Sequence, residues 1–199
     1  MAVEYNLHIR NMVCPRCITT VRSVLAGMGL DVRETSLGRA RVFSSKPIEE
    51  GVIDGELRKQ GFALITDPEQ KTVENIKVSL IEYISRLENA DQPVSMSSDL
   101  SHQLAMSYQH LSRIFSKSEH ITIEKYLILL KIERVKELLS YGELTLSEIA
   151  YRLKYSSVQH LSGQFKKVTG LSVSEFRAAG AVHRHSLDAV GRPNGGEDW

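Results

Sequence analysis

Apolar residues recur at helical spacing through the second half of the chain. Stretches 72–87 and 123–139 show this spacing, and so do two shorter segments around Leu111 and Leu161. Because an α-helix completes a turn every 3.6 residues, apolar residues three and four positions apart line one face of a helix. Polar residues occupy the opposite faces of the two shorter segments. The pattern therefore predicts an all-helical C-terminal half with a shared apolar core.

The first 66 residues show a different pattern, in which short strand-like segments alternate with helical ones. Strands are predicted over 3–9, 31–35, 39–43 and 61–65, and helices over 16–28 and 48–60. The order βαββαβ is typical of a ferredoxin-like domain, in which two helices cover one face of a four-stranded sheet. We therefore expect an α+β chain, with a ferredoxin-like domain followed by an all-α domain.

Changes in pattern suggest where the domains begin and end. The ferredoxin-like domain is predicted over 1–66, a linker over 67–76 and the helical domain over 77–178. Residues 179–199 show no apolar periodicity and end in a stretch rich in Gly and polar residues, so we expect a disordered tail. His183 and His185 fall in this tail and are interpreted as solvated rather than as metal ligands.

A nine-residue motif occurs twice in the helical half. Gln109-His-Leu-Ser-Arg-Ile-Phe-Ser-Lys117 is followed fifty residues later by Gln159-His-Leu-Ser-Gly-Gln-Phe-Lys-Lys167, and six of the nine positions are identical. The similarity extends upstream, with one residue inserted in the second copy, so each copy is predicted to be a helix, a turn and a helix. Thr145-x-x-Glu148 and Ser156-x-x-Gln159 fit the capping box that marks a helix start.

The exposed face of the second helix in each copy carries side chains suited to nucleic-acid recognition. Amide and guanidinium groups make paired hydrogen bonds to base edges in the major groove, whereas lysines mainly contact phosphates. The predicted DNA-contacting residues are Gln109, Ser112, Arg113, Ser116, Lys117, Ser157, Gln159, His160, Gly163, Lys166 and Lys167. The intervening helix would span roughly 25 Å at 1.5 Å per residue, against roughly 34 Å between successive major grooves on one face of DNA. This spacing favours a two-part reader of double-stranded DNA.

Several motifs of the helical half occur in an order that matches a known family. They include Lys131-Ile-Glu-Arg-Val-Lys-Glu-Leu-Leu, Leu146-Ser-Glu-Ile-Ala, His160-Leu-Ser-Gly-Gln-Phe-Lys-Lys and Thr169-Gly-Leu-Ser-Val-Ser-Glu-Phe-Arg177. With these motifs the C-terminal half resembles the DNA-binding domain of AraC-family transcription regulators. The resemblance implies two helix-turn-helix units joined by a central helix, with recognition helices in adjacent major grooves.

The chain departs from that family at three informative positions. Ala105 and Lys154 stand where the family usually has glycine in the turns, and Gly163 stands where relatives often carry a base-contacting Arg or Asn. Glycine permits close approach of the backbone but supplies no side chain for hydrogen bonding. The second recognition helix is therefore expected to read sequence weakly.

The chain's cysteines, Cys14 and Cys17, lie three residues apart at the start of a predicted helix. Through Asn11-Met-Val-Cys-Pro-Arg-Cys17 and the later Gly61-Phe62, residues 3–65 resemble the heavy-metal-associated domain of copper chaperones and metal-pump ATPases. The resemblance implies a soft metal ion held by both thiolates, and thiolates favour Cu(I) or Zn(II). Two ligands suffice for Cu(I), whereas Zn(II) would need further ligands from a second chain.

Two other interpretations of the cysteine pair stay open. The thiols could form a reversible redox switch, or the segment could be a binding loop without a metal role. Arg16 and the start of a helix both stabilise a nearby thiolate, which is compatible with the metal and redox readings. Met12 is interpreted as a buried core side chain rather than a ligand.

Composition narrows the function classes without choosing one. The formal net charge is +1 and 42% of residues are hydrophobic, so non-specific affinity for DNA should be modest and sensitive to salt. No apolar run approaches the roughly 20 residues of a membrane span, and the N-terminus lacks a secretory signal, so we expect a cytoplasmic protein. No catalytic triad, phosphate loop or paired-carboxylate site is recognisable, so we do not expect an enzyme.

These observations favour a transcription regulator with an N-terminal input domain and a C-terminal DNA-binding domain. The input would be a soft metal or, alternatively, thiol oxidation. A competing hypothesis is a metal carrier or interaction protein whose helical half binds a protein partner instead of DNA. The helix predicted over 72–87 is read as a core helix of the DNA-binding domain, with a second reading as a lever or dimer contact between domains. A homodimer is compatible with this second reading.

Overall fold

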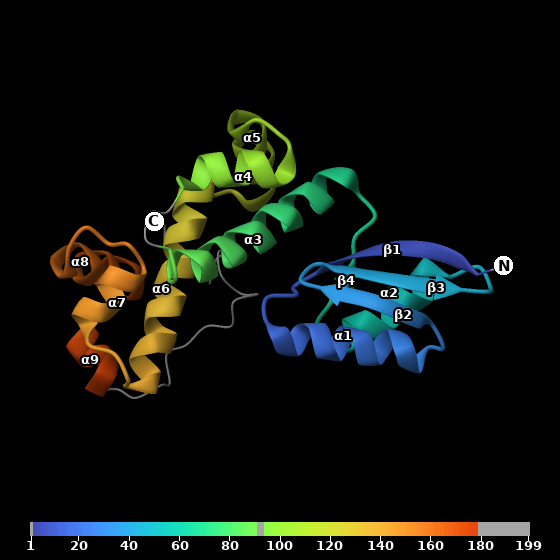
Figure 1. Ribbon diagram of the computed structural model, residues 1–199, viewed down its shortest axis with the longest axis horizontal. Helices are drawn as coiled ribbons and strands as arrows, with labels where there is room; N and C mark the ends of the chain where they lie inside the picture. The colour runs from blue at the N-terminus through green and yellow to red at the C-terminus, as the bar shows by residue number, and fades with distance from the viewer. Residues whose placement is uncertain (1, 91–93, 179–199) are drawn as a thin grey trace. The chain divides into compact units, whose positions relative to one another are not determined.

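The computed structural model describes residues 2–90 and 94–178 and divides the chain into two compact units (Figure 1). The first unit is Met1–Val78 and the second begins at Ser79. The first contains an antiparallel sheet with helices, and the second is helical. The chain is therefore α+β, as predicted. The predicted tail, 179–199, lies outside the described residues.

The first unit begins with the predicted element order βαββαβ. The elements are β1 (Val3–Arg10), α1 (Pro15–Gly27), β2 (Asp31–Ser36), β3 (Arg39–Ser44), α2 (Glu50–Arg58) and β4 (Ala63–Leu64). Their bounds lie close to those predicted from the sequence, except that β4 has only two residues. Apolar and polar residues alternate along β1, so Leu7 and Ile9 are buried on one side of the strand.

The four strands form one antiparallel sheet in the order β2-β3-β1-β4. β1 pairs with β3 from Val3↔Ser44 to His8↔Arg39, and it pairs with β4 through Ile9↔Leu64. Helices α1 and α2 lie against the same face of the sheet (Figure 1). The buried core between the layers includes Leu7, Ile9, Met12, Val21, Leu25, Val42, Ile53 and Leu57.

Helix α3 (Pro68–Leu87) is one continuous helix of 20 residues that both units share. Asp67 starts it, because its carboxylate accepts the backbone N–H of Gln70 at 2.7 Å. The segment interpreted from the sequence as a linker, 67–76, is therefore mostly helical. Asp67-Pro68 resembles a domain boundary in sequence, but Pro fits the first turn of a helix, where no hydrogen bond needs its missing N–H.

The first half of α3 packs on the N-terminal unit. A Cβ atom added at Gly38, in the β2–β3 turn, would lie 3.1 Å from Cγ2 of Val78, and Gly38 has a positive φ of 73°. Glycine therefore suits this turn both because of the close approach and because of its backbone conformation. The apolar face predicted over 72–87 is buried along the helix, at Val73, Ile76, Leu80, Ile84 and Leu87.

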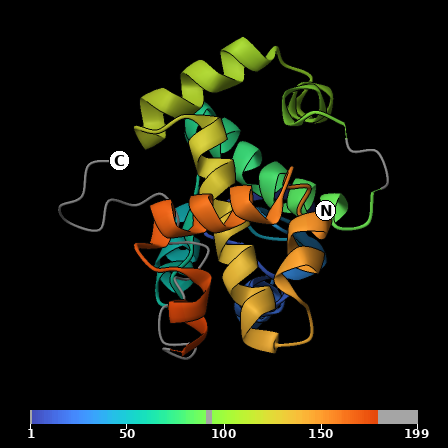
Figure 2. The same ribbon diagram turned by 90° about the vertical axis from the view of Figure 1, so that its left-hand side faces the viewer.

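The second unit contains two helix-turn-helix copies with a long helix between them (Figures 1 and 2). Its elements after α3 are α4 (Met96–Leu104), α5 (Tyr108–Glu119), α6 (Ile123–Tyr141), α7 (Leu146–Arg152), α8 (Val158–Thr169) and α9 (Val173–Ala178). Helices α4 and α5 form the first copy, α7 and α8 form the second, and α6 joins them. The helix-turn-helix pairs and the central helix agree with the sequence prediction. None of the described helices combines the length and the apolar character that a membrane span requires.

Hydroxyl groups cap the helices of both copies. The capping box at the start of α7 is confirmed, because Thr145 and Glu148 each accept a hydrogen bond from the other's backbone N–H. The second predicted capping box is wrong by one residue. Ser157, not Ser156, caps α8 and accepts the N–H of His160 at 3.0 Å. The hydroxyl of Ser156 instead lies 3.0 Å from Nδ1 of His160.

Candidate nucleic-acid interface and thiol loop

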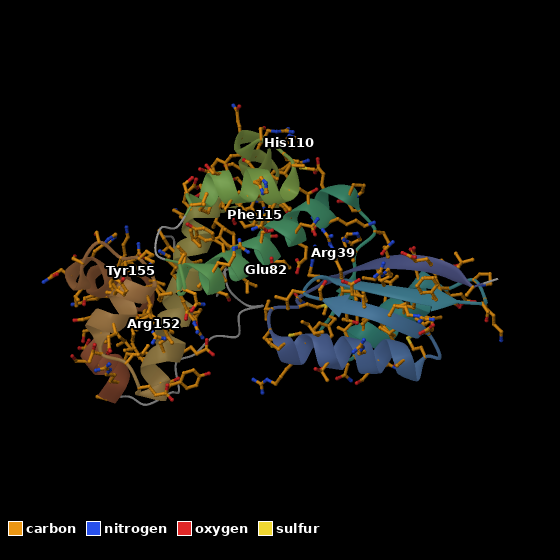
Figure 3. All side chains as sticks on the ribbon, in the orientation of Figure 1. Arg39, Glu82, His110, Phe115, Arg152 and Tyr155 are labelled. Atoms are coloured by element: carbon orange, nitrogen blue, oxygen red, sulfur yellow. The ribbon has the colours of Figure 1, made fainter. Side chains whose placement is uncertain are left out.

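Helix α5 is divided into a buried face and an exposed face. Leu111, Ile114 and Phe115 are buried, and the ring of Phe115 packs edge-on against Tyr126 of α6 at 5.3 Å between centroids. Figure 3 shows His110 at the outer side of α5, with Phe115 of the same helix pointing into the helical unit. Because α6 holds the apolar face, the polar face of α5 stays accessible to a ligand.

The start of α5 is fixed to α6 by a polar contact. The Tyr108 hydroxyl donates a hydrogen bond to the Glu124 carboxylate. Burial and this hydrogen bond raise the pKa of Tyr108, so the phenol stays protonated at neutral pH. One turn further along, a guanidinium nitrogen of Arg113 lies 3.5 Å from Nδ1 of His110. Arg113 is exposed and has no carboxylate partner among the described residues, so its charge is directed at solvent.

Helix α8 repeats the arrangement of α5 with different polar groups. Leu161 and Phe165 are buried, and the ring of Phe165 packs edge-on against Phe176 of α9 at 5.4 Å. Gln159, Gly163, Lys166 and Lys167 are exposed on the other side. The buried faces of both helices agree with the apolar spacing in the sequence, except that Val168, expected in the core, is only half-buried.

A polar cluster around Tyr155 secures the start of α8. The Tyr155 hydroxyl donates to Oε1 of Gln164 at 2.8 Å, and its ring lies edge-on to the His160 imidazole at 5.4 Å. Nζ of Lys131, on α6, lies 4.9 Å from the centre of the same ring. Burial raises the pKa of Tyr155 and lowers the pKa of Lys131. The cluster joins α8 to α6 and includes the labelled Tyr155 in Figure 3.

Sequence reasoning missed this cluster, although the repeat contains a signal for it. Where the second copy has Tyr155 and Gln164, the first copy has Met106 and Ile114. Both polar groups are therefore present in one copy and absent from the other, which is the pattern expected of a hydrogen-bonded pair. No comparable signal points to Lys131, because its partner is an aromatic ring on another element.

The residues predicted to contact DNA all lie on or immediately before α5 and α8. Ser112 and Ser116 are half-buried, and the other predicted residues are exposed, namely Gln109, Arg113, Lys117, Ser157, Gln159, His160, Gly163, Lys166 and Lys167. Ser157 uses its hydroxyl to cap α8, and the imidazole of His160 is held by Ser156 and Tyr155. These two side chains therefore have structural roles in addition to any contact with a ligand.

Ion pairs brace α6, the helix between the two copies. Nε and a terminal nitrogen of Arg134 lie 2.6 and 2.9 Å from the two carboxylate oxygens of Glu88, just after α3, and Glu137 lies 2.7 Å from the third nitrogen. Within α6, Lys136 and Glu133 form a buried pair at 2.6 Å. A guanidinium group matches a carboxylate with two parallel hydrogen bonds, so the contact with Glu88 fixes orientation as well as distance. The charged side chains on this part of α6 are thus paired within the protein.

The thiol loop lies in the N-terminal unit at the start of α1. Cys14 is the N-cap residue of α1 and Cys17 lies in the first turn, with 3.3 Å between the two Sγ atoms. Burial opposes ionisation of Cys14, but hydrogen bonds from the Cys17 backbone and thiol and from the Arg16 backbone outweigh it and lower the pKa of Cys14. Burial and the neighbouring Cys14 raise the pKa of Cys17. Of the two thiols, Cys14 therefore ionises more readily than Cys17.

The two thiols lie closer together than two sulfur ligands of one metal ion. With metal–sulfur bonds of about 2.3 Å, two thiolates stand about 3.8 Å apart in a tetrahedral site and about 4.6 Å apart in a linear one. The observed 3.3 Å between the half-buried thiols of Cys14 and Cys17 is shorter than both distances. In the described part of the chain, no group of three or more His, Cys, Asp or Glu side chains could hold a metal. Met12 is fully buried in the core, as predicted.

Asn11, which precedes Met12 and the thiol loop, connects the loop to α3. Asn11 has a positive φ of 71°, a conformation that asparagine tolerates better than most residues. Its backbone N–H donates to Oε1 of Glu74 on α3 at 3.0 Å, and its side-chain amide donates to the Gly61 carbonyl at 2.9 Å. Glu74 is only 6% exposed. The thiol loop is therefore hydrogen-bonded to the helix that both units share.

The helical half of the chain is similar to known proteins. Residues 100–179 match the helix-turn-helix domain family. The Msm operon regulatory protein of Streptococcus mutans serotype c is 28% identical over 134 residues, which cover 65% of this chain and 48% of that protein. The chain thus spans about half the length of this curated relative.

Two solved structures are similar to part of this chain. The C-terminal domain of AraT, a response regulator from Geobacillus stearothermophilus, is 25% identical with a TM-score of 0.46, covering 57% of this chain and 86% of that one. The C-terminal domain of the two-component response regulator yesN from Fusobacterium nucleatum is 29% identical with a TM-score of 0.43, covering 52% and 98%. On the family match, the C-terminal half of this chain carries a helix-turn-helix domain.

Proposed function

We propose that this chain is a sequence-specific, DNA-binding transcription regulator of the AraC type. One observation carries the proposal. The helix-turn-helix match covers two equivalent helices, α5 and α8, each of which buries an apolar face and exposes a polar one. The similarity to the Msm operon regulatory protein supports the same role. Exposed amide, guanidinium and ammonium groups are those that contact base edges and phosphates.

Selection of genomic DNA fragments by the purified chain, followed by sequencing, tests this proposal. A sequence reader enriches fragments that share a motif. A protein whose helical half binds a protein partner enriches no motif, and that result would reject the regulator. The salt concentration must be held constant, because phosphate contacts make affinity strongly salt-dependent.

Two variants separate base reading from phosphate binding. Arg113→Ala is expected to cost about 1–3 kcal/mol on the selected site and to relax the preference at one base pair. Lys167→Ala is expected to weaken binding to all sequences similarly and to reduce the salt dependence. Both are measured by titration of labelled DNA at several salt concentrations. Equal, sequence-independent losses from both variants would contradict the assigned roles.

We further propose that the N-terminal unit is a ferredoxin-like input domain whose thiol pair binds a soft metal ion such as Cu(I) or Zn(II). The strand order β2-β3-β1-β4 and the element order βαββαβ support the fold. The 3.3 Å between the thiols and the lowered pKa of Cys14 support the chemistry, because the thiolate is the form that binds metal. Zn(II) would need ligands from a second chain, which makes a metal-linked homodimer part of the proposal.

The route from the thiol loop to the DNA-binding half is proposed to run through α3. Asn11 precedes the loop and donates to the buried Glu74 of α3, so a rearrangement of the loop changes a hydrogen bond on that helix. For metal to alter DNA affinity, the two states of the protein must bind metal with different strength. Thiol oxidation would act on the same loop and is the alternative input.

Anaerobic metal titration of the wild type and of Cys14→Ser tests the input. We expect the substitution to abolish tight Cu(I) binding, and unchanged binding would reject the thiol site. Repeating the experiment with a mild oxidant instead of metal, and measuring free thiols by mass spectrometry, tests the redox alternative. Because its pKa is lowered, Cys14 should be alkylated faster than Cys17 below the usual thiol pKa.

The variant Glu74→Ala tests the route separately. We expect it to keep metal affinity and to reduce the effect of metal on DNA affinity, because Asn11 loses its acceptor on α3. Glu74→Gln keeps an acceptor oxygen and should retain the effect. Glu82→Ala, an exposed position on the same helix, is the matched control. A metal effect unchanged in Glu74→Ala would reject this route.

A further inference from the structure

We infer that the two helix-turn-helix copies contribute unequally to sequence recognition. In this inference α5 reads bases, whereas α8 mainly holds the DNA backbone, so the operator has one strongly specified half-site and one weakly specified half-site. The inference rests on the proposed function and concerns the same surface. It follows from three differences between positions that the internal repeat makes equivalent.

The first difference is between Arg113 and Gly163, which are fifty residues apart and occupy the same place in the repeat. Arg113 is exposed and has His110 beside it at 3.5 Å. Gly163 is equally exposed, and a Cβ atom placed there would meet nothing within 4 Å. The fold therefore does not require glycine at this position. In place of a group that hydrogen-bonds guanine through two nitrogens, α8 presents bare backbone.

The second difference concerns the amide next to that glycine. Oε1 of Gln164 accepts the Tyr155 hydroxyl at 2.8 Å, so this amide is used inside the protein. The equivalent residue of α5, Ile114, is buried and apolar. A glutamine on a recognition helix is a candidate to read adenine, but here its acceptor oxygen is already engaged. Gln164 therefore fastens α8 and is not available in this rotamer to read a base.

The third difference concerns the two equivalent histidines. The His160 imidazole is held between Ser156, at 3.0 Å, and the ring of Tyr155, at 5.4 Å. Within residues 2–90 and 94–178, no comparable pair of contacts holds His110, which lies beside Arg113. The exposed polar side chains that α8 still offers are Gln159, Lys166 and Lys167. Ammonium groups bind phosphates without distinguishing bases, so one amide remains to read sequence.

Selection from a randomised DNA library with the full chain provides the primary test. The expected motif has one half-site with several fixed base pairs and a second, about one helical turn away, with little preference. Shortening the DNA so that the second half-site is removed should still weaken binding, because the phosphate contacts of α8 are lost. A motif with two half-sites of equal information content would overturn the inference while leaving the proposed function intact. Absence of any enriched motif would instead reject the proposed function.

The variant Gly163→Arg should supply what α8 lacks. We expect a new preference for guanine in the weak half-site, with about 5- to 150-fold discrimination against other bases, the range given by one good bidentate contact. Gly163→Ala is the matched control, since it fills the same open space without adding a hydrogen-bonding group, and it should leave the weak half-site unchanged. If Gly163→Arg folded normally and bound DNA but added no base preference, the missing side chain at position 163 would not be the cause of the weak half-site, and the argument from the first difference would be wrong.

The reciprocal variants complete the test. Arg113→Gly should remove about 5- to 150-fold of discrimination from the strong half-site, so that the two half-sites become similar. Gln164→Ala should leave base preference unchanged, because its amide is engaged with Tyr155. Loss of a specified base pair in Gln164→Ala would contradict the second difference. Circular dichroism and thermal melting of every variant establish that each is folded before its DNA preference is compared.

Discussion

The two helix-turn-helix copies share a backbone plan and differ in the side chains that decorate it. In each copy a residue other than glycine adopts the left-handed conformation in the turn, with φ of 51° at Ala105 and 54° at Lys154. In each, a serine hydroxyl caps the second helix, and a phenylalanine of that helix is fully buried. These features fix where the helix starts and which face it buries.

The side chains on the outer faces diverge. Arg113 of the first copy corresponds to Gly163 of the second, and the apolar Ile114 corresponds to Gln164, which is hydrogen-bonded to Tyr155. Caps, turns and core positions are constrained by the fold, since each satisfies backbone groups or fills space. Outer positions are constrained by what the surface binds. The comparison thus separates the residues that make the helix from the residues that give it a ligand.

The largest predicted effects come from the shared anchors. Phe115→Ala and Phe165→Ala should each lower the free energy of unfolding by about 3–5 kcal/mol, because both rings are fully buried and pack against other aromatic rings. Urea denaturation followed by circular dichroism measures the loss. Phe→Leu at the same positions is the control and should cost much less. A loss below about 1 kcal/mol at one site only would show that the two copies are not equally well packed.

The serine caps should have the next largest effect. Ser107→Ala and Ser157→Ala should each destabilise the chain by about 1 kcal/mol, because each removes an acceptor for a free backbone N–H. Ser156→Ala is the informative control, as its hydroxyl faces the His160 ring rather than the helix backbone. If Ser156→Ala destabilised the chain more than Ser157→Ala, Ser156 and not Ser157 would be the N-cap of α8.

Glycine at the left-handed turn positions should be mildly stabilising. Ala105→Gly and Lys154→Gly relieve the crowding of Cβ at positive φ, and we expect gains of up to about 1 kcal/mol despite the greater freedom of the unfolded chain. Thermal melting with a fitted unfolding enthalpy measures the change. Gly163→Ala, inside α8, should also stabilise the chain by up to about 1 kcal/mol, because alanine has a higher helix propensity than glycine. Destabilisation of both turn variants would contradict the turn conformations.

The smallest predicted effect is a difference in how α7 and α4 contribute to the pH dependence of stability. Hydrogen bonds from the hydroxyl and backbone of Thr145 lower the pKa of Glu148 in the folded state. A lowered pKa gives stability that is present above the unfolded-state value, about 4.3, and that is lost as pH falls through the folded-state value. Glu148→Gln should therefore flatten the fall in stability on acidification. Helix α4 has Ser98 at the matching position, so Ser98→Ala should leave the pH dependence unchanged. An unaltered acid limb in Glu148→Gln would contradict the capping box.

The sequence was sufficient where one residue type solves one local problem. The apolar spacing around Leu111 and Leu161 predicted which faces of α5 and α8 are buried. Thr145-x-x-Glu148 predicted the start of α7, because both members of a capping box lie within one turn. The cysteine pair was placed at the start of α1 by the same local reasoning.

Sequence alone did not suffice where the partner comes from another element or where two local solutions compete. Ser156 and Ser157 can both cap a helix, and the chosen register depends on how α8 packs. Asp67-Pro68 fits a linker and a helix start equally well, and the packing of α3 decides. Some contacts join segments far apart in the chain, as between Tyr155 and Lys131 or Asn11 and Glu74. No local sequence pattern predicts such contacts.

The placement of the unit boundary within α3 has a consequence for how the two halves can be separated. The division falls between Val78 and Ser79, inside an unbroken helix of 20 residues. Cleaving the chain there would leave each fragment with a piece shorter than the roughly 12–15 residues that a solitary helix needs to persist in water. In neither fragment would its piece of α3 stay helical. A fragment prepared from either half should therefore include the whole of residues 68–87.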